Sequence, residues 1–217
     1  MDINIELDLK IRKANFNDNL KEIAELIYYT DDYIYPYWFE TLEKCQDELP
    51  NLLIEENFFF NINNLYIAID EANNKIAGVI CIVDKSISLE YNYDDLRNYN
   101  ERYRFTVDNY IMGLIEEVKE SDFAYISNVC VHPEYRGQHI GNKLVNHVIE
   151  VYAEKCFNEI VLDVLAENPG AIRLYEKLGF EQFTEIFKGF NNPTKEKPDV
   201  FSMKLNLEQI SDESIES

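Results

Sequence analysis

The 217-residue sequence predicts one domain of the α/β or α+β class, in which helices cover a central sheet. This length is sufficient for one well-buried core. The composition, with 46% hydrophobic and 28% charged residues, is typical of soluble globular proteins. From residue 123 onward, strand patterns alternate with amphipathic helix patterns, and such a strand–helix–strand order requires a parallel pair. We therefore expect a single domain over residues 1–207 and an acidic tail at 208–217.

The first third of the chain is expected to form a strand, two helices and a hairpin. Polar and apolar residues alternate over residues 6–12, as in a half-buried strand. Asn or Asp at positions 17–19 can cap a helix whose apolar residues share one face. A second helix is expected from about Phe39 to Leu49, ending before Pro50, and the hairpin strands at 65–69 and 76–83.

A polar, tyrosine-rich segment follows at residues 87–121. Apolar residues recur at helical spacing in its second half, residues 106–118. The segment is too short to bury a core of its own. We interpret it as a helical insert between two strands that either lies against the substrate side or forms a homodimer contact.

The remainder is the most regular part of the chain. A strand is expected at 123–131, a turn at 132–137 and a helix at 140–156. A strand at 159–165, a helix at 169–178 and two last strands at 180–187 and 199–205 complete the domain.

Charge and composition exclude several classes of protein. The chain has 41 acidic and 20 basic residues, a net charge of −21, which disfavours binding to nucleic acid phosphates. The longest apolar run, about residues 76–83, is far too short to span a bilayer, and the start does not resemble a secretory signal. The four cysteines have no zinc-site spacing, so we expect reduced thiols, no metal and a cytoplasmic, membrane-free protein.

The segment from Val129 to Gly141 (VCVHPEYRGQHIG) leads from a strand through a glycine-bearing turn into a helix. Such a turn directs free backbone N–H groups and the positive end of the helix dipole toward one point. Arg136 adds a positive charge, and residues 136–149 contain no acid despite the acidic composition. The segment therefore predicts a site for a diphosphate.

A second motif, Asn168 to Phe180 (NPGAIRLYEKLGF), begins about thirty residues downstream of that turn. With both motifs, the sequence resembles the GNAT superfamily of N-acetyltransferases, and in particular its ribosomal-protein alanine N-acetyltransferase subfamily. The match covers residues 123–187, under a third of the chain. It implies a mixed, mostly antiparallel, twisted sheet of about seven strands. It also implies a splayed parallel pair between strands 4 and 5, with the insert between strands 3 and 4.

The resemblance implies acetyl-CoA as the cosubstrate. The backbone of Val129, Cys130 and Val131 should bind the pantetheine arm and the thioester, and Asn168 should contact the cofactor. Asn168 before a proline is also an ordinary helix cap. The diphosphate is expected on the N–H groups of Arg136, Gly137, Gln138, His139, Ile140, Gly141 and Asn142. His139 replaces a family glycine, which costs about 1–2 kcal/mol if its φ is positive and nothing if its φ is helical.

Acetyl transfer needs a neutral amine, donors for the oxyanion and a protonated leaving thiolate. The resemblance implies that Tyr175 gives the proton to the thiolate, although a buried helix tyrosine also serves packing. Asp163 occupies the place of a proposed family base, and its alternative role is a salt bridge or a solvated carboxylate. We expect direct attack by a primary amine in a ternary complex.

The acceptor amine is left open: a peptide N-terminus, a lysine, a polyamine and an antibiotic amine all remain. Tyr33 and Tyr35, in the aromatic segment 28–39, are candidate substrate-binding residues for a cationic amine. The alternative is that these rings pack the core. A catalytically silent acyl-CoA sensor and a donor other than acetyl-CoA, such as succinyl-CoA, are the competing functions.

Overall fold

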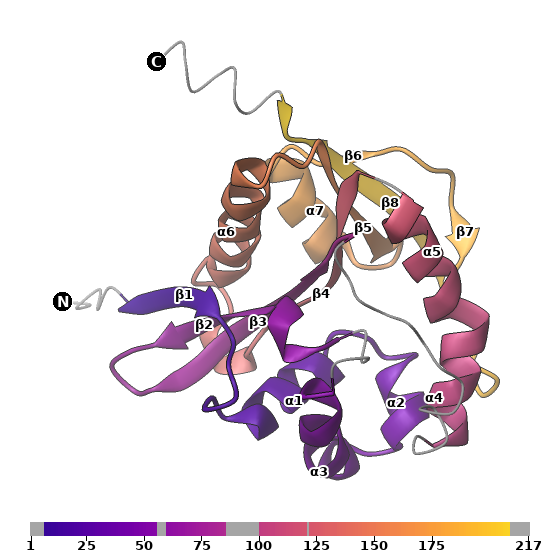
Figure 1. Cartoon of the computed structure of the whole chain (residues 1–217), viewed down its shortest axis with the longest axis horizontal. Helices are drawn as coiled ribbons and strands as arrows, with labels where there is room; N and C mark the ends of the chain where they lie inside the picture. The colour runs from indigo at the N-terminus through magenta and orange to yellow at the C-terminus, as the bar shows by residue number, and fades with distance from the viewer. Residues whose placement is uncertain (1–6, 56–59, 86–99, 121, 209–217) are drawn as a thin grey trace.

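Eight strands form one sheet in the order β1-β2-β3-β4-β5-β8-β6, with β7 paired to β8 (Figure 1). This is a computed structural model, which describes residues 7–55, 60–85, 100–120 and 122–208. The strands are β1 (Leu9–Lys13), β2 (Leu65–Asp70), β3 (Lys75–Val83), β4 (Phe123–Val131), β5 (Glu159–Leu165), β6 (Glu181–Gln182), β7 (Phe187–Lys188) and β8 (Asp199–Asn206).

The helices comprise three before the hairpin, an insert and two in the C-terminal part. They are α1 (Leu20–Tyr28), α2 (Tyr35–Phe39), α3 (Leu42–Leu53), α4 (Glu101–Thr106), α5 (Met112–Glu120), α6 (Ile140–Glu154) and α7 (Pro169–Lys177). A π-helical turn, Val107–Ile111, joins α4 to α5. No helix in the described ranges is long and apolar enough to cross a membrane.

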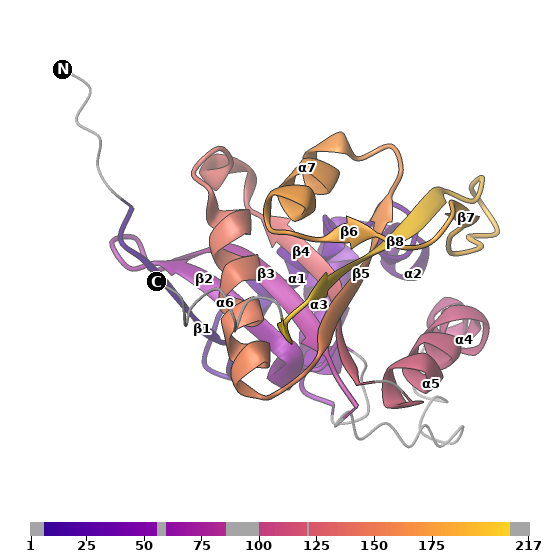
Figure 2. The ribbon, with the colours of Figure 1, turned by 90° about the horizontal axis from the view of Figure 1, so that it is seen from above.

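The sheet separates two apolar cores. One core holds α6 and α7 against one face, and the other holds α1, α2, α3 and the insert against the opposite face (Figures 1 and 2). Successive side chains of the central strands point to opposite faces and so contribute to both cores: Ile126 belongs to the first core and Tyr125 to the second. On β5 the same alternation sends Leu162 to the first core and Val161 to the second. Asp163, two residues after Val161, therefore faces the insert side.

The parallel pair at the centre of the sheet separates partway along its length. β4 and β5 pair from Phe123 opposite Glu159 to Ile126 opposite Leu162. Beyond these residues β4 continues to pair with β3, and β5 continues to pair with β8. The other strand pairs are antiparallel. The expected splay between the fourth and fifth strands is confirmed.

The helical insert is also confirmed, in residues 101–120, between β3 and β4. It lies on the β5–β8 side of the sheet, away from β1 (Figures 1 and 2). Trp38 Nε1 donates to Thr106 Oγ1 at 2.7 Å, and Arg102 donates to the Tyr37 carbonyl at 3.2 Å. The insert thus packs on the aromatic segment. The predicted residues 87–99 and 121 lie outside the described ranges.

Several predicted boundaries were wrong. The second helix begins at Leu42 and not at Phe39, because Tyr35–Phe39 forms the separate helix α2. The second helix does not end before Pro50: α3 continues to Leu53, because the burial of Leu49 and Leu53 outweighs one missing backbone hydrogen bond. The strand expected over 180–187 is split into β6 and β7. There the Thr184 hydroxyl, instead of a backbone carbonyl, accepts the Ser202 N–H at 2.8 Å, which interrupts the ladder.

Candidate active site

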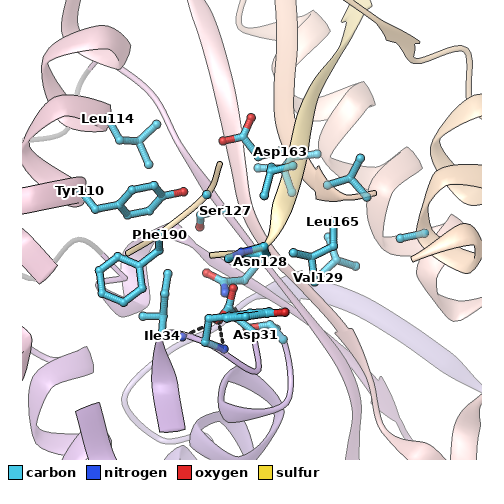
Figure 3. A pocket seen from close by; sticks show the side chains of 18 of the residues that line it. Asp31, Ile34, Tyr110, Leu114, Ser127, Asn128, Val129, Asp163, Leu165 and Phe190 are labelled. Atoms are coloured by element: carbon cyan, nitrogen blue, oxygen red, sulfur yellow. Dashed lines mark hydrogen bonds between the residues drawn. The ribbon is translucent and has the colours of Figure 1, made fainter. Parts of the chain in front are cut away.

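A cavity of about 160 Å³ opens where β4 and β5 separate. Its walls come mainly from β4, β5, α7, the insert and the segments around Tyr33 and Phe190. Figure 3 shows the side chains that line it, with Asp163 at one end, Asp31 at the other and Asn128 between them. Tyr110 of the insert and Phe190 of the loop before β8 close one side. The insert therefore lies against the expected substrate side.

The backbone of β4 presents free groups to the separation. The His132 N–H donates to the Ala77 carbonyl of the β3 edge at 2.9 Å. Because backbone groups alternate along a strand, Cys130 also directs its N–H and C=O toward β3, and Val129 and Val131 direct theirs away from it, toward β5. The Arg136 Nε atom reaches the Val131 carbonyl at 3.4 Å from that side.

The Cys130 side chain is buried, and this burial raises the pKa of its thiol to about 11. A neutral, buried thiol is a poor nucleophile at physiological pH. Cys130 therefore serves as a packing residue, and no thiolate chemistry is expected from it.

The glycine-bearing turn ends at the N-terminus of α6. Gly137 has a φ of 78°, and His139, the helix N-cap, has a φ of 59°. No side chain caps this helix end. The Arg136 N–H donates to the Pro133 carbonyl at 3.3 Å, so this amide is already used by the turn. The next bonded amide is Lys143, which donates to the His139 carbonyl at 3.1 Å, so the amides from Gly137 to Asn142 remain available to a ligand. Arg136, Gly137, Gln138 and His139 are exposed, Gly141 and Asn142 are half-buried, and Ile140 is buried.

The positive φ of His139 settles the alternative left by the sequence. A non-glycine residue in this left-handed region costs about 1–2 kcal/mol. The imidazole is exposed, so the turn keeps the glycine-type backbone and holds the side chain in solvent. His139 thus adopts the left-handed backbone conformation that glycine favours at this position.

Asn168 caps α7, because its Oδ1 atom accepts the Ala171 N–H at 3.1 Å. It also lines the cavity. Its structural role as a cap is therefore established, and its side-chain NH₂ group is still able to donate to a ligand.

Tyr175 lies on α7 at the cavity, 7% exposed, with its ring against Phe180. Burial raises the pKa of its hydroxyl to about 12. Its hydroxyl makes no hydrogen bond to any residue that the structure describes. Tyr175 is consequently a protonated donor that faces the cavity and is not used by the fold.

Asp163 faces the same cavity from β5. Its Oδ1 accepts the Ser202 hydroxyl at 2.6 Å, and its Oδ2 accepts the Tyr125 hydroxyl at 3.2 Å. Burial raises the pKa of this carboxyl above its usual range, while the two hydrogen bonds oppose the shift. No ion pair involves Asp163 in the described part of the chain. Among the described residues, Asp163 therefore does not form the salt bridge that was its alternative role.

The two candidate substrate tyrosines occupy different environments. Tyr35 is 1% exposed and packs edge-on against Trp38 and Phe60, as a core residue whose hydroxyl reaches the cavity. Tyr33 is half-buried at the rim, with Lys195 Nζ 5.2 Å from its ring centre and Glu167 near its hydroxyl. Of the two, only Tyr33 has a partly exposed ring that a ligand can contact.

Asp31, an acid within the aromatic segment, also lines the cavity, and Tyr110 and Asn128 line it without having been predicted as site residues. Asp31 accepts the N–H groups of Tyr33 at 2.6 Å and Ile34 at 2.5 Å, and burial raises the pKa of its carboxyl. Burial likewise raises the pKa of Tyr110, which keeps that hydroxyl neutral. Asn128 was detectable as an amide that, with Ser127, interrupts a mostly apolar strand. No group of three or more His, Cys, Asp or Glu side chains in the described ranges could hold a metal ion.

A family model described as "Acetyltransferase (GNAT) family" matches residues 27–180, well over half of the chain. The chain belongs to the GNAT acetyltransferase family. The family uses acetyl-CoA, and the free amides of the α6 turn, the exposed Arg136 and the open edge of β4 fit a CoA thioester in this GNAT chain.

Curated relatives match this GNAT chain over its motif region. An uncharacterized N-acetyltransferase of Methanocaldococcus jannaschii is 43% identical over 77 residues, which is 35% of this chain and 33% of the relative. The ribosomal protein bS18-alanine N-acetyltransferase of Escherichia coli K12 is 34% identical over 86 residues, 40% of this chain and 57% of the relative. The chain thus spans from a third to little more than half of the length of these relatives.

Solved structures share the fold at low sequence identity. A spermidine N-acetyltransferase from Vibrio cholerae, in complex with CoA and spermine, has a TM-score of 0.58 at 22% identity, over 92% of this chain and 96% of that one. An N-acetyltransferase from Staphylococcus aureus Mu50 has a TM-score of 0.63 at 21% identity, over 90% and 100% of the two chains. At these identities the likeness establishes the GNAT fold alone.

Proposed function

We propose that this chain transfers the acetyl group of acetyl-CoA to a primary amine by direct attack in a ternary complex. The observation that carries the proposal is the position of two opposed groups at the strand separation. Tyr175 lines the cavity from α7 on one face of the sheet, and Asp163 lines it from the other face. A thioester held along the free edge of β4 lies between a proton donor and a base in this arrangement.

The residues that bind acetyl-CoA in this proposal are Arg136, the amides at the start of α6 and the backbone of β4. Arg136 and the free amides at the start of α6 bind the diphosphate, because both supply positive potential to an anion. The backbone groups of Val129 and the Val131 N–H bind the pantetheine arm and the thioester carbonyl. An oxyanion that develops on this carbonyl accepts a β4 N–H, a contact typically worth about 3 kcal/mol.

The proton transfers are assigned to Asp163 and Tyr175. Asp163, directly or through a water, takes the proton that makes the ammonium a neutral nucleophile. As the amine nitrogen forms its bond to the carbonyl carbon and the carbon–sulfur bond breaks, the Tyr175 hydroxyl gives its proton to the departing sulfur. Tyr175 regains a proton from solvent, and Asp163 releases its proton there. Each transfer typically contributes about 10²–10⁴ in rate.

The nature of the amine is drawn from the surroundings of the cavity. The bS18-alanine enzyme acts on a protein amine, and the Vibrio structure carries spermine, so relatives use both peptide and polyamine acceptors. The acids Asp31 and Asp163 and the ring of Tyr33 favour a cationic acceptor here. A silent sensor has no need for Tyr175 and Asp163 to converge on the same cavity.

The test is a screen of amines with acetyl-CoA, in which mass spectrometry detects the acetylated product. Peptide N-termini, lysine peptides, polyamines and aminoglycosides form the panel. The proposal predicts acetylation of at least one class, lost in the double variant Asp163→Asn/Tyr175→Phe. Binding of acetyl-CoA without transfer to any member would instead support the sensor.

A further inference from the structure

The side chain of Asn128 carries a buried acceptor that the fold does not use. Asn128 lies on β4 and is 6% exposed. Its Nδ2 donates to the Thr30 hydroxyl at 2.7 Å and to the Tyr35 hydroxyl at 3.0 Å. Its Oδ1 is buried and has no hydrogen-bond partner among the described residues. A buried acceptor without a partner destabilises a protein, so it requires an explanation.

The orientation of this amide follows from its neighbours. The Thr30 hydroxyl donates its only proton to the Ile27 carbonyl at 2.6 Å, and so offers Asn128 an acceptor. The Asn128 nitrogen must therefore face Thr30, and a flipped amide would set two acceptors against each other. Oδ1 is consequently held in place as a buried, unpaired acceptor of a residue that lines the cavity next to Val129 (Figure 3).

The charges around Asn128 all have the same sign. Asp31 and Asp163 line the cavity on either side of it, and no Lys, Arg or His is among the residues of the cavity wall. Lys195 lies outside this wall, where it donates to the Asp32 carbonyl at 2.5 Å and lies over the Tyr33 ring. An ammonium is favoured at such a site, and an added carboxylate is repelled.

We propose, resting on the proposed function, that Asn128 Oδ1 accepts an N–H of the acceptor amine beside the thioester. The same site selects primary amines that have no carboxylate next to the nitrogen. Peptide N-termini and small diamines share this chemistry, whereas free amino acids, which carry a carboxylate on the adjacent carbon, do not. Asn128 is a substrate-binding residue in this scheme, because it fixes the nitrogen while Asp163 takes the proton.

The experiment compares matched acceptors on the full chain with saturating acetyl-CoA: alaninamide, 1,4-diaminobutane and alanine. We expect alaninamide or the diamine to be acetylated with a kcat/KM at least about tenfold above that of alanine, because like charges repel in the cavity. Equal use of alanine would overturn the inference and assign its carboxylate to Lys195. Acetylation of neither amine, by a protein that acetyl-CoA still stabilises, would also overturn it. If acetyl-CoA does not stabilise the protein, the proposed function itself fails.

Asn128→Ala tests the residue. We expect kcat/KM for the preferred amine to fall about 10–100-fold, mainly through KM, because a hydrogen bond to a charged group is lost. The KM for acetyl-CoA should not change. The matched control is Thr106→Val, which removes the buried hydrogen bond to Trp38 in the same core and should keep the amine KM within about twofold.

A second measurement does not depend on the folding of a variant. In the wild-type protein with CoA, the preferred amine should shift the Asn128 side-chain ¹⁵N–¹H resonances, and alanine should not. An unchanged amine KM in Asn128→Ala, or resonances that do not respond to the amine, would overturn the assignment to Asn128.

Discussion

The Tyr125 hydroxyl donates a hydrogen bond of 3.2 Å to the carboxylate of Asp163. Tyr125 lies on β4 within the paired region, and Asp163 is the first residue of β5 beyond it. The bond thus joins the two strands at the point where they begin to separate, and it fixes the carboxylate toward the cavity. The Ser202 hydroxyl of β8 holds the other oxygen at 2.6 Å. Asp163 is therefore a half-buried carboxylate that is oriented by two neutral donors.

The first prediction concerns the base. Asp163→Asn should lower turnover most at pH 6–7, where an amine with a pKa of about 8–10 is almost fully protonated. The loss should shrink toward pH 9, where more of the amine is neutral. The pH dependence of kcat/KM in both proteins provides the measurement, and equal activity across this range would exclude Asp163 as the base.

The same substitution has an expected effect on stability. Because burial raises the folded-state pKa of Asp163, its protonated form stabilises the fold below the unfolded pKa of about 3.9. That contribution is lost as the pH rises through the folded pKa. Asp163→Asn should therefore raise the Tm at pH 7 relative to wild type and lose this advantage near pH 3.5. A lower Tm at pH 7 would show that the charged carboxylate stabilises the fold.

The second prediction concerns the proton donor. Tyr175→Phe should lower kcat by about 10²–10⁴ and leave the Kd for acetyl-CoA nearly unchanged, because the hydroxyl acts on the leaving sulfur. The control is Tyr152→Phe, a buried tyrosine on α6 whose hydroxyl bonds to Asp84. Turnover is expected to survive that change. If Tyr175→Phe retains full turnover, the residue is only a packing residue.

The third prediction concerns the diphosphate turn. Acetyl-CoA at a hundred times its Kd should stabilise the wild type by about 2.7 kcal/mol, measured as a rise in Tm. Arg136→Glu should remove most of this rise, because it places a negative charge beside the diphosphate. Lys177→Glu, the same charge change at the far end of α7, serves as the control and should retain it. An undiminished rise in Arg136→Glu contradicts the assignment.

The fourth prediction concerns His139. Its φ of 59° suits glycine, so His139→Gly should raise the free energy of unfolding by about 1 kcal/mol. Acetyl-CoA binding should persist, because the backbone amides and not the imidazole are assigned to the diphosphate. Cys156→Gly, at a φ of 61° after α6, is the matched control: it should give the same gain in the free energy of unfolding, and it lies outside the diphosphate turn. A large loss of acetyl-CoA affinity in His139→Gly would instead place the imidazole on the phosphates.

The fifth prediction separates the two tyrosines of the aromatic segment. Tyr35→Ala should destabilise the protein by about 3–5 kcal/mol, as for other buried aromatic residues. Tyr33→Ala should raise the KM of the acceptor and leave the Tm nearly unchanged, because its ring lies at the cavity rim. Thermal denaturation and acceptor kinetics on both variants test this, and the reverse pattern would contradict the assignment of rim and core.

Local patterns predicted the central part of the fold. β4 and β5 have the predicted bounds, and the cap of α1 is Asn19, whose side chain accepts the Glu22 N–H. These elements depend on periodicity and capping, which neighbouring residues determine. The path of α3 through Pro50 could not be predicted in this way, because the burial that stabilises it depends on packing against distant elements.

Only those residues of the candidate site that belong to a motif, or to a position of the family resemblance, could be predicted from the sequence. Tyr175 and the α6 turn belong to the two motifs, and Asp163 follows from the resemblance to the family. Asn128 acquires its role from Thr30 and Tyr35, which are 98 and 93 residues away in the sequence. Tyr110 reaches the cavity through the packing of the insert, which no local pattern specifies.

The most direct test of the account is the two-substrate kinetics of the wild-type chain with isotopically labelled acetyl-CoA and the preferred amine, followed by mass spectrometry. We predict label in the amine product, intersecting double-reciprocal lines, and no labelled protein when acetyl-CoA is added alone. Absence of labelled product with every amine of the panel, or parallel lines together with a labelled protein intermediate, would contradict direct transfer at this site.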